Sequence, residues 1–196
     1  MIRRSGLFVA IAVVVILGVG VVYQVTQGDA DGDASPVRST PTTASFTSTT
    51  QPPLVEGTAP ALVNTGDDFA AIIRSFVAYQ DWVGAHPDPA LLGETIDSSC
   101  PCLAPSQQNM AELKAKGWRY EPGVDTEVQE VKPRTVTGDV VDVFVAIRYP
   151  ERKVLDATDR VVKSEPAEPP TSYFYTLRRG GDGRWRITEI QLGTVL

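Results

Sequence analysis

Hydrophobic residues follow a helical period in the first half of the region from residue 67 to the C-terminus. Two carboxylates, Asp67 and Asp68, precede an apolar stripe with a spacing near 3.6: Phe69, Ile72, Ile73, Phe76, Val77 and Tyr79. This spacing predicts an amphipathic helix that ends near Gly84, and the leading carboxylates suit its N-terminus. After Pro87 and Pro89, a short second helix is expected to carry Ala90, Leu91, Leu92 and Ile96, and a third spans 105–116 and stops at Gly117.

From Trp118 onward the period changes to two, which is typical of strands. The clearest strand places Val141, Val143, Val145 and Ile147 on one face. Two more strands, 171–178 and 185–192, flank a glycine-rich hairpin loop, and weaker ones are expected at 126–131, 154–157 and 161–164. Helices followed by strands, without βαβ alternation, indicate an α+β domain with a curved antiparallel sheet wrapped on the helices. This arrangement requires burial of Ile73, Val143, Val145 and Ile187.

The N-terminal segment has the pattern of a membrane anchor. Arg3 and Arg4 precede an uncharged apolar run, Leu7 to Tyr23, whose length approaches that needed to cross about 30 Å of hydrocarbon. The sequence therefore predicts a cytoplasmic stub and transmembrane signal-anchor over 1–27. The positive-inside rule places the C-terminal part outside the cytoplasm, at the plasma membrane. The alternative is a cleaved signal peptide with its cleavage site at 28–30.

Residues 28–66 are rich in Ser, Thr and Pro and lack apolar periodicity. Such a segment buries too little surface to offset the entropy of ordering the chain, so it predicts a disordered linker. The linker is either a plain spacer or an O-glycosylated stalk. The extracytoplasmic α+β domain is then 67–196.

Composition and charge exclude several classes of function. The 196-residue chain has 18 Lys and Arg against 24 Asp and Glu, a net charge of -6. It therefore lacks the excess of positive charge that is typical of nucleic-acid binders. One His and two Cys leave few ligands for a zinc site, and no phosphate-binding glycine loop is present, so we expect no metal and no cofactor. The expected partners are the membrane and either a cell-envelope protein or a small apolar ligand.

The segment Cys100-Pro101-Cys102 is the sharpest local motif. Outside the cytoplasm two thiols at this spacing are expected to form a structural disulfide that pins the turn between the second and third helices. The alternative is a redox-active pair, because a strained bond near a helix N-terminus is more oxidising. Metal binding by the two thiolates alone is a weaker third interpretation.

The order of elements, ending in the hairpin GGDGRWRITEIQL, resembles the nuclear transport factor 2-like (cystatin-like) superfamily. A narrower similarity, carried by SSCPCLAPSQQNMAELKAKGWRYEPG, is to an uncharacterised actinobacterial family of membrane-anchored or lipoprotein domains. The resemblance implies an exported, cone-shaped domain with a pocket, and it implies no particular activity.

Enzymes of the resembled fold place a carboxylate or His base and a Tyr or Asp acid inside the cone. Here His86 lies in an expected loop without a surrounding motif, so we assign no catalytic residue. Tyr79, Tyr173 and Tyr175 are candidate pocket-lining residues, with core packing as the alternative. We expect a non-catalytic binding or assembly module. The alternatives are a cone-pocket enzyme of the isomerase or dehydratase type, which needs a buried polar pair, and a Cys-Pro-Cys oxidoreductase.

Overall fold

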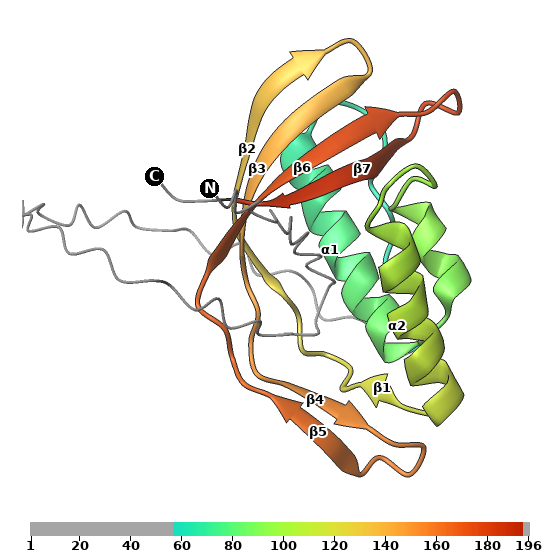
Figure 1. The fold of residues 1–196 in the computed structure, drawn as a ribbon. Coiled ribbons are helices and arrows are strands. Elements are labelled where there is room, and N and C mark those ends of the chain that lie inside the picture. Colours follow the sequence, from blue (N-terminus) through green and yellow to red (C-terminus); the bar gives the residue numbers. More distant parts are fainter. Residues whose placement is uncertain (1–56, 194–196) are drawn as a thin grey trace, which may run out of the picture.

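The computed structural model describes residues 57–193, which contain helices followed by strands, as the sequence predicts (Figure 1). The predicted anchor and all of the predicted linker before Gly57 lie outside the described residues. Within residues 57–193, no helix is both long enough and apolar enough to span a membrane.

Helix α1 (Phe69–Ala85) begins at Asp68, whose Oδ1 accepts a hydrogen bond from the Ala71 backbone N–H at 3.0 Å. This contact caps one of the donors that a helix N-terminus leaves unpaired. Helix α2 (Leu103–Lys116) ends at Gly117, which adopts the left-handed conformation with φ 64°. Glycine takes this conformation without the steric cost that a Cβ would add. The predicted first and third helices are therefore confirmed.

The predicted second helix is shorter than expected. It is a single 3-10 segment, η1 (Pro89–Glu94), and Ile96 lies outside it. Ile96 instead forms a parallel bridge to Ile187: the Asp97 N–H donates to the Ile187 carbonyl, and the Ile187 N–H donates to the Thr95 carbonyl, both at 2.9 Å. The chain leaves the helix here because these bonds satisfy backbone groups on an otherwise open strand edge.

The strands form two antiparallel sheets where a single curved sheet was expected. A four-stranded sheet has the order β2-β3-β6-β7, and a three-stranded sheet has the order β1-β4-β5. The strand bounds are β1 (Arg119–Tyr120), β2 (Glu127–Thr137), β3 (Val140–Arg148), β4 (Arg152–Leu155), β5 (Val161–Glu165), β6 (Thr171–Arg179) and β7 (Trp185–Leu192). Strand β2 continues past the predicted end at Val131, although its last part is exposed. Pro133 is tolerated there because β2 is an edge strand with an irregular register beside it.

The two sheets follow one another along a curved surface (Figure 1). Strand β3 leads into β4, and β5 leads back into β6, so the hairpin β4–β5 extends beyond the larger sheet. A hydrogen bond from the Glu168 N–H to the Tyr149 carbonyl, at 2.9 Å, joins the two connections. The α+β class with helices packed against curved antiparallel sheets is therefore confirmed.

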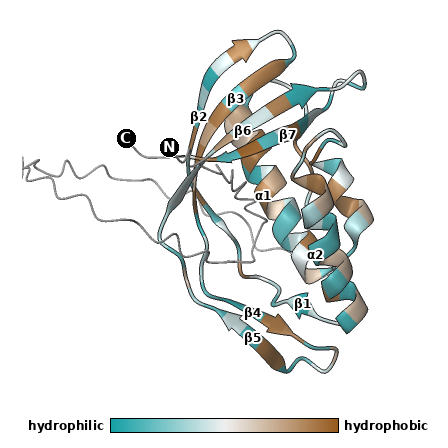
Figure 2. Ribbon diagram, in the orientation of Figure 1, coloured by the Kyte–Doolittle hydropathy of each residue, from teal (hydrophilic) through white to brown (hydrophobic). Residues whose placement is uncertain are grey.

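The core lies between α1 and the inner face of the four-stranded sheet. Ile73, Val143, Val145 and Ile187 are completely buried, as the two periods predict. Figure 2 shows hydrophobic residues on the helices and alternating along the strands. Trp185 is 1% exposed and meets Phe69 edge-on, with ring centroids 5.3 Å apart. This contact attaches the C-terminal hairpin to the start of α1.

The last residues of the predicted linker belong to the folded domain. The Trp185 N–H donates to the Asn64 carbonyl at 2.7 Å, and the Trp185 Nε1–H donates to the Gly66 carbonyl at 2.8 Å. The Val63 N–H donates to Ser75 Oγ at 3.1 Å, and Leu62 packs on the core. These contacts use mainly backbone groups, so the composition of 61–66 does not reveal them.

Candidate functional site

A cavity lies between the helices and the region where β3 passes into β4. The space inside it that the centre of a water molecule can occupy is about 40 Å³, enough for about three waters or a small organic group. Its walls come from α1, η1 and α2 and from strands β1, β3 and β4. The apolar part of the wall consists of Val77, Leu92, Met110, Val124 and Ile147.

Asp81, on α1, is one of two carboxylates that line this cavity; the other is Glu121. Both of its oxygens accept hydrogen bonds from Thr126, Oδ2 from the backbone N–H and Oδ1 from the hydroxyl, each at 2.7 Å. Burial raises the pKa of Asp81 to about 6, against the lowering effects of the Thr126 bonds and of the Arg152 charge. Asp125 adds to the rise. The carboxylate is thus fixed in place and titrates close to neutral pH.

Arg152, on β4, is the cation at the same cavity. Its guanidinium carbon lies 4.9 Å from the centroid of the Tyr149 ring and 5.3 Å from that of Tyr120. Burial raises the pKa of Tyr120 to about 12, and the positive charge of Arg152 acts against this rise. The two rings hold the guanidinium by cation–π contacts beside the cavity.

The tyrosines expected to line a pocket are core residues. Tyr79, Tyr173 and Tyr175 are 5%, 3% and 2% exposed, and the wall of the cavity is formed without them. Tyr173 and Tyr175 act on Tyr149, whose pKa is raised first by burial and then by these two tyrosines. The cavity does have aromatic walls, but Tyr120 and Tyr149 supply them. Tyr120 lies in a two-residue strand too short to show a period. Tyr149 continues the alternation of Val145 and Ile147 and is buried as they are, a signal that could have placed it on the inner face.

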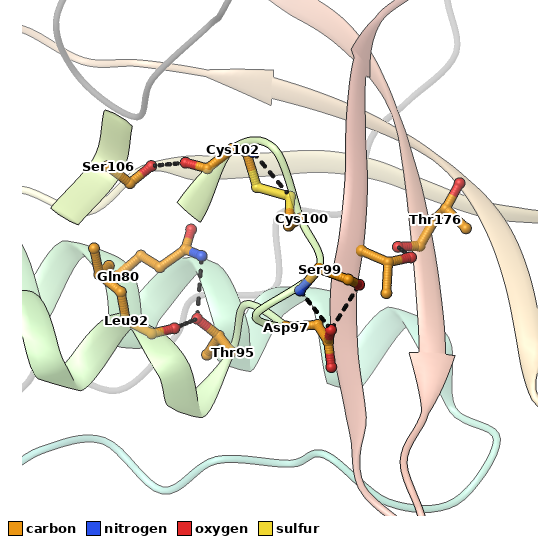
Figure 3. Close-up of a disulfide and its surroundings, with 10 residues drawn as sticks. Gln80, Leu92, Thr95, Asp97, Ser99, Cys100, Cys102, Ser106 and Thr176 are labelled. Carbon is orange, nitrogen blue, oxygen red and sulfur yellow. Dashed lines mark hydrogen bonds between the residues drawn. A yellow bond between two sulfur atoms is a disulfide. The ribbon is translucent and has the colours of Figure 1, made fainter. Parts of the chain in front are cut away.

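The end of the cavity near α2 is polar. Gln80 and Ser106 both line it. The Gln80 Nε2 group donates to Thr95 Oγ1 at 3.3 Å, and the Gln80 carbonyl oxygen points toward the side on which Ser106 lies (Figure 3). Ser106 Oγ donates to the Cys102 carbonyl at 2.8 Å. This side of the cavity is therefore connected to the turn that contains the cysteines.

Cys100 and Cys102 are joined by a disulfide, with an S–S distance of 2.04 Å and a Cα–Cα distance of 5.1 Å (Figure 3). The bond lies at the start of α2, where Cys102 is the N-cap residue and no side chain caps the helix. Cys100 is buried in the core cluster. The disulfide thus fixes the turn that leads into the α2 wall of the cavity.

His86 lies outside this cavity, at the C-terminal end of α1. Its ring stacks on Trp82 with centroids 4.6 Å apart, and its Nδ1 lies 3.0 Å from the Trp82 carbonyl. Because a carbonyl only accepts, Nδ1 carries the proton. Both residues border a second, smaller hollow, which shares Asp81, Glu121 and Val124 with the first. Among the residues that the structure describes, no group of three or more His, Cys, Asp or Glu side chains is placed to hold a metal.

Asp81, Thr126 and Arg152 were not predicted as site residues, although the sequence carries a signal for two of them. Asp81 follows Ile73 and Val77 at a spacing of four, so a carboxylate occupies the apolar stripe of α1. Arg152 precedes the buried Val154 by two residues, which puts both on one face of β4. A charged residue in an apolar stripe is the pattern that marks a buried site.

No protein-family model matches this chain. No curated protein matches it either. Several solved structures are similar. The intermembrane space region of the chloroplast protein ARC6 is 16% identical, with 66% of this chain and 98% of that chain covered and a TM-score of 0.43. A nuclear transport factor 2-like superfamily protein from Salmonella enterica is 9% identical, with 63% and 89% covered and a TM-score of 0.42.

A protein described as a putative scytalone dehydratase from Novosphingobium aromaticivorans is 13% identical, with 63% of this chain and 82% of that chain covered and a TM-score of 0.42. The Salmonella protein is described as a member of the superfamily that the sequence resembles. The similarity concerns the arrangement of helices and strands. The narrower resemblance to an actinobacterial family stays an expectation.

Proposed function

We propose that this domain is a binding module, held outside the plasma membrane on a tether, whose cavity takes a small and mainly apolar molecule. The observation that supports this most directly is the composition of the cavity wall. Apolar side chains from four separate elements and one loop converge there, with a few fixed polar groups among them. This combination is typical of sites that bind small molecules.

Nuclear magnetic resonance of Met110 tests the binding function. The chain contains two methionines, Met1 and Met110, so a methyl-labelled full chain in lipid nanodiscs gives a simple spectrum. Small neutral probes such as benzyl alcohol and cyclohexanol are expected to shift the Met110 methyl signal and leave that of Met1 unchanged. The variant Val124→Phe, which fills the cavity from its loop side, serves as the control and should lose the response. A Met110 signal that no probe shifts would contradict the binding function.

A second candidate is a proton-transfer enzyme of the isomerase or dehydratase type. It is favoured by Asp81, because a pKa of about 6 suits a general base that works near neutral pH. However, both oxygens of Asp81 already accept hydrogen bonds from Thr126, which favours a structural role for this carboxylate. Exchange of the α-deuterium atoms of deuterated cyclohexanone with water distinguishes a proton-transfer enzyme from a binding module. Exchange that the protein accelerates and that Asp81→Asn abolishes would establish the enzyme.

The location outside the membrane is supported by the order of charges around the apolar N-terminal run and by the disulfide, because thiol pairs oxidise mainly outside the cytoplasm. Protease added to spheroplasts is expected to digest the C-terminal domain while the protein stays with the membrane fraction. A soluble secreted form with a new N-terminus near Asp31 would instead establish a cleaved signal peptide.

A further inference from the structure

We propose that the ligand of the cavity is a small organic carboxylate, that its apolar body lies against the aliphatic wall, and that Arg152 is the residue that selects its charge. This inference rests on the proposed binding function and goes beyond it by naming the class of ligand. The observation behind it is that Arg152, a cation at the cavity wall, makes no direct salt bridge within residues 57–193.

Arg152 makes no direct salt bridge within residues 57–193. It takes part in no ion pair shorter than 4.0 Å there, and its buried Nε–H has no hydrogen-bond partner in that part of the chain. Buried donors are nearly always satisfied, and an unsatisfied one costs about 1–3 kcal/mol. A charged donor left in this condition at a cavity wall is expected where a ligand supplies the acceptor.

The carboxylates around Arg152 are bound to other residues. Asp81 accepts two hydrogen bonds from Thr126. Glu121, on the loop that lines the cavity, pairs with Lys153 at 3.5 Å. Each therefore has another partner.

Glu165, which faces Arg152 across the β4–β5 pair, is also occupied. It pairs with Lys163 at 2.7 Å. The protein thus places three acidic residues near Arg152 and uses none of them to neutralise it by direct contact.

The position of Arg152 suits a planar anion. The rings of Tyr120 and Tyr149 hold the guanidinium, so little rotamer freedom is lost when an anion binds. A guanidinium presents parallel N–H donors that match the two oxygens of a carboxylate. Val77, Leu92, Met110 and Ile147 supply an apolar wall in the same cavity, which suits a compact aliphatic or aromatic body.

Benzoate and benzamide form a matched pair of probes, because they have the same planar shape and differ in charge. In titrations of the full chain in nanodiscs, followed by the Met110 methyl signal, benzoate is expected to bind about tenfold more tightly than benzamide. Arg152→Gln should remove this preference while benzamide affinity stays within about twofold, which also shows that the variant remains folded. Arg152→Lys, which keeps the charge, should retain part of the preference.

Arg148→Gln is the control, because Arg148 is an exposed arginine on the neighbouring strand β3 that pairs with Glu127 outside the cavity. It should leave both affinities unchanged. Equal binding of benzoate and benzamide to the unmodified protein, or a preference that survives in Arg152→Gln, would overturn the carboxylate inference and leave the binding function intact. If neither these probes nor the neutral ones move the Met110 signal, the binding function itself fails.

Discussion

The two sheets of this domain differ in what they contribute. The four-stranded sheet presents a continuous inner face of completely buried residues, including Val141, Val143, Val145 and Leu177. The three-stranded sheet buries less and is exposed along β5, where Val161 and Val162 are 52% and 40% exposed. Yet the smaller sheet carries Arg152 and Tyr120, the cation of the cavity and one of the rings that hold it.

We infer from this difference that the larger sheet stabilises the fold and that the smaller sheet serves ligand recognition. Buried apolar area drives folding, so the larger sheet together with α1 carries most of the free energy of the fold. A partly exposed hairpin on that base can accept polar and charged residues without loss of the core, and binding residues are commonly placed on such supported elements. Substitutions in the two sheets should therefore affect different measurements.

The largest effect is expected from Val145→Asp in β3. Val145 is completely buried, and an unpaired carboxylate there costs more than about 4 kcal/mol, so the variant should not fold stably. Val162→Asp in β5 is the matched control and should change stability by less than about 0.5 kcal/mol, because the side chain already faces solvent. Thermal unfolding followed by circular dichroism measures both. Equal destabilisation by the two substitutions would contradict the division between the sheets.

The second effect is the dependence of stability on pH through Asp81. Its folded-state pKa is raised from 3.8 to about 6, so the folded protein binds a proton more tightly than the unfolded chain. Stability therefore falls as pH rises from about 4 to about 6, by about 3 kcal/mol in all. The charged groups that act on Asp81 are Arg152, which lowers its pKa, and Asp125, which raises it; Asp81 in turn raises the pKa of Tyr175.

Urea unfolding of the unmodified protein and of Asp81→Asn, between about pH 4 and about pH 7, isolates this contribution. The variant loses a hydrogen bond to Thr126, worth about 1 kcal/mol, but its stability should lack the fall that the unmodified protein shows. Parallel curves for the two proteins would mean that Asp81 titrates normally.

The core was predictable from sequence to a greater extent than the cavity. The stripe of α1 and the alternation of β3 each involve many residues, and both periods lead to the same inner face, so Ile73 and Val145 were placed correctly. The split into two sheets was not predictable, because it depends on the short connections near Tyr149 and Glu168. Neither connection has a hydrophobic period.

The cavity depends on contacts between residues that are distant in sequence. The bond between Asp81 and Thr126 spans 45 positions, and Arg152 meets Tyr120 from another strand. Periodicity identifies the face of an element on which a residue lies, and it does not identify the residue opposite. For this reason Tyr79, Tyr173 and Tyr175 were assigned to the correct faces but not distinguished from the residues that border the cavity.

A smaller effect is expected from removal of the disulfide. The ring closed by Cys100 and Cys102 is short, so the bond restricts the unfolded chain little, and Cys100→Ser should cost about 1–2 kcal/mol. The purified protein should show no free thiol in titration with a thiol reagent. It should also fail to accelerate the oxidative refolding of a reduced test protein. Refolding activity that disappears in Cys102→Ser would establish an oxidoreductase instead.

The smallest effect on stability, with a clear effect on binding, is expected from Gly84→Ala. Gly84 lies in α1 and faces β1, and an added Cβ would come within 2.9 Å of Tyr120 Cδ2, so the ring must shift. The gain in helix propensity, about 1 kcal/mol, offsets much of the steric cost, and the free energy of unfolding should change by less than about 1 kcal/mol. Because Arg152 stands over the Tyr120 ring, benzoate affinity should nevertheless fall about threefold or more.

Gly93→Ala in η1 is the control, because an added Cβ there meets nothing within 4 Å, and it should leave binding unchanged. If Gly84→Ala leaves benzoate affinity unchanged as well, the Tyr120 ring does not position Arg152.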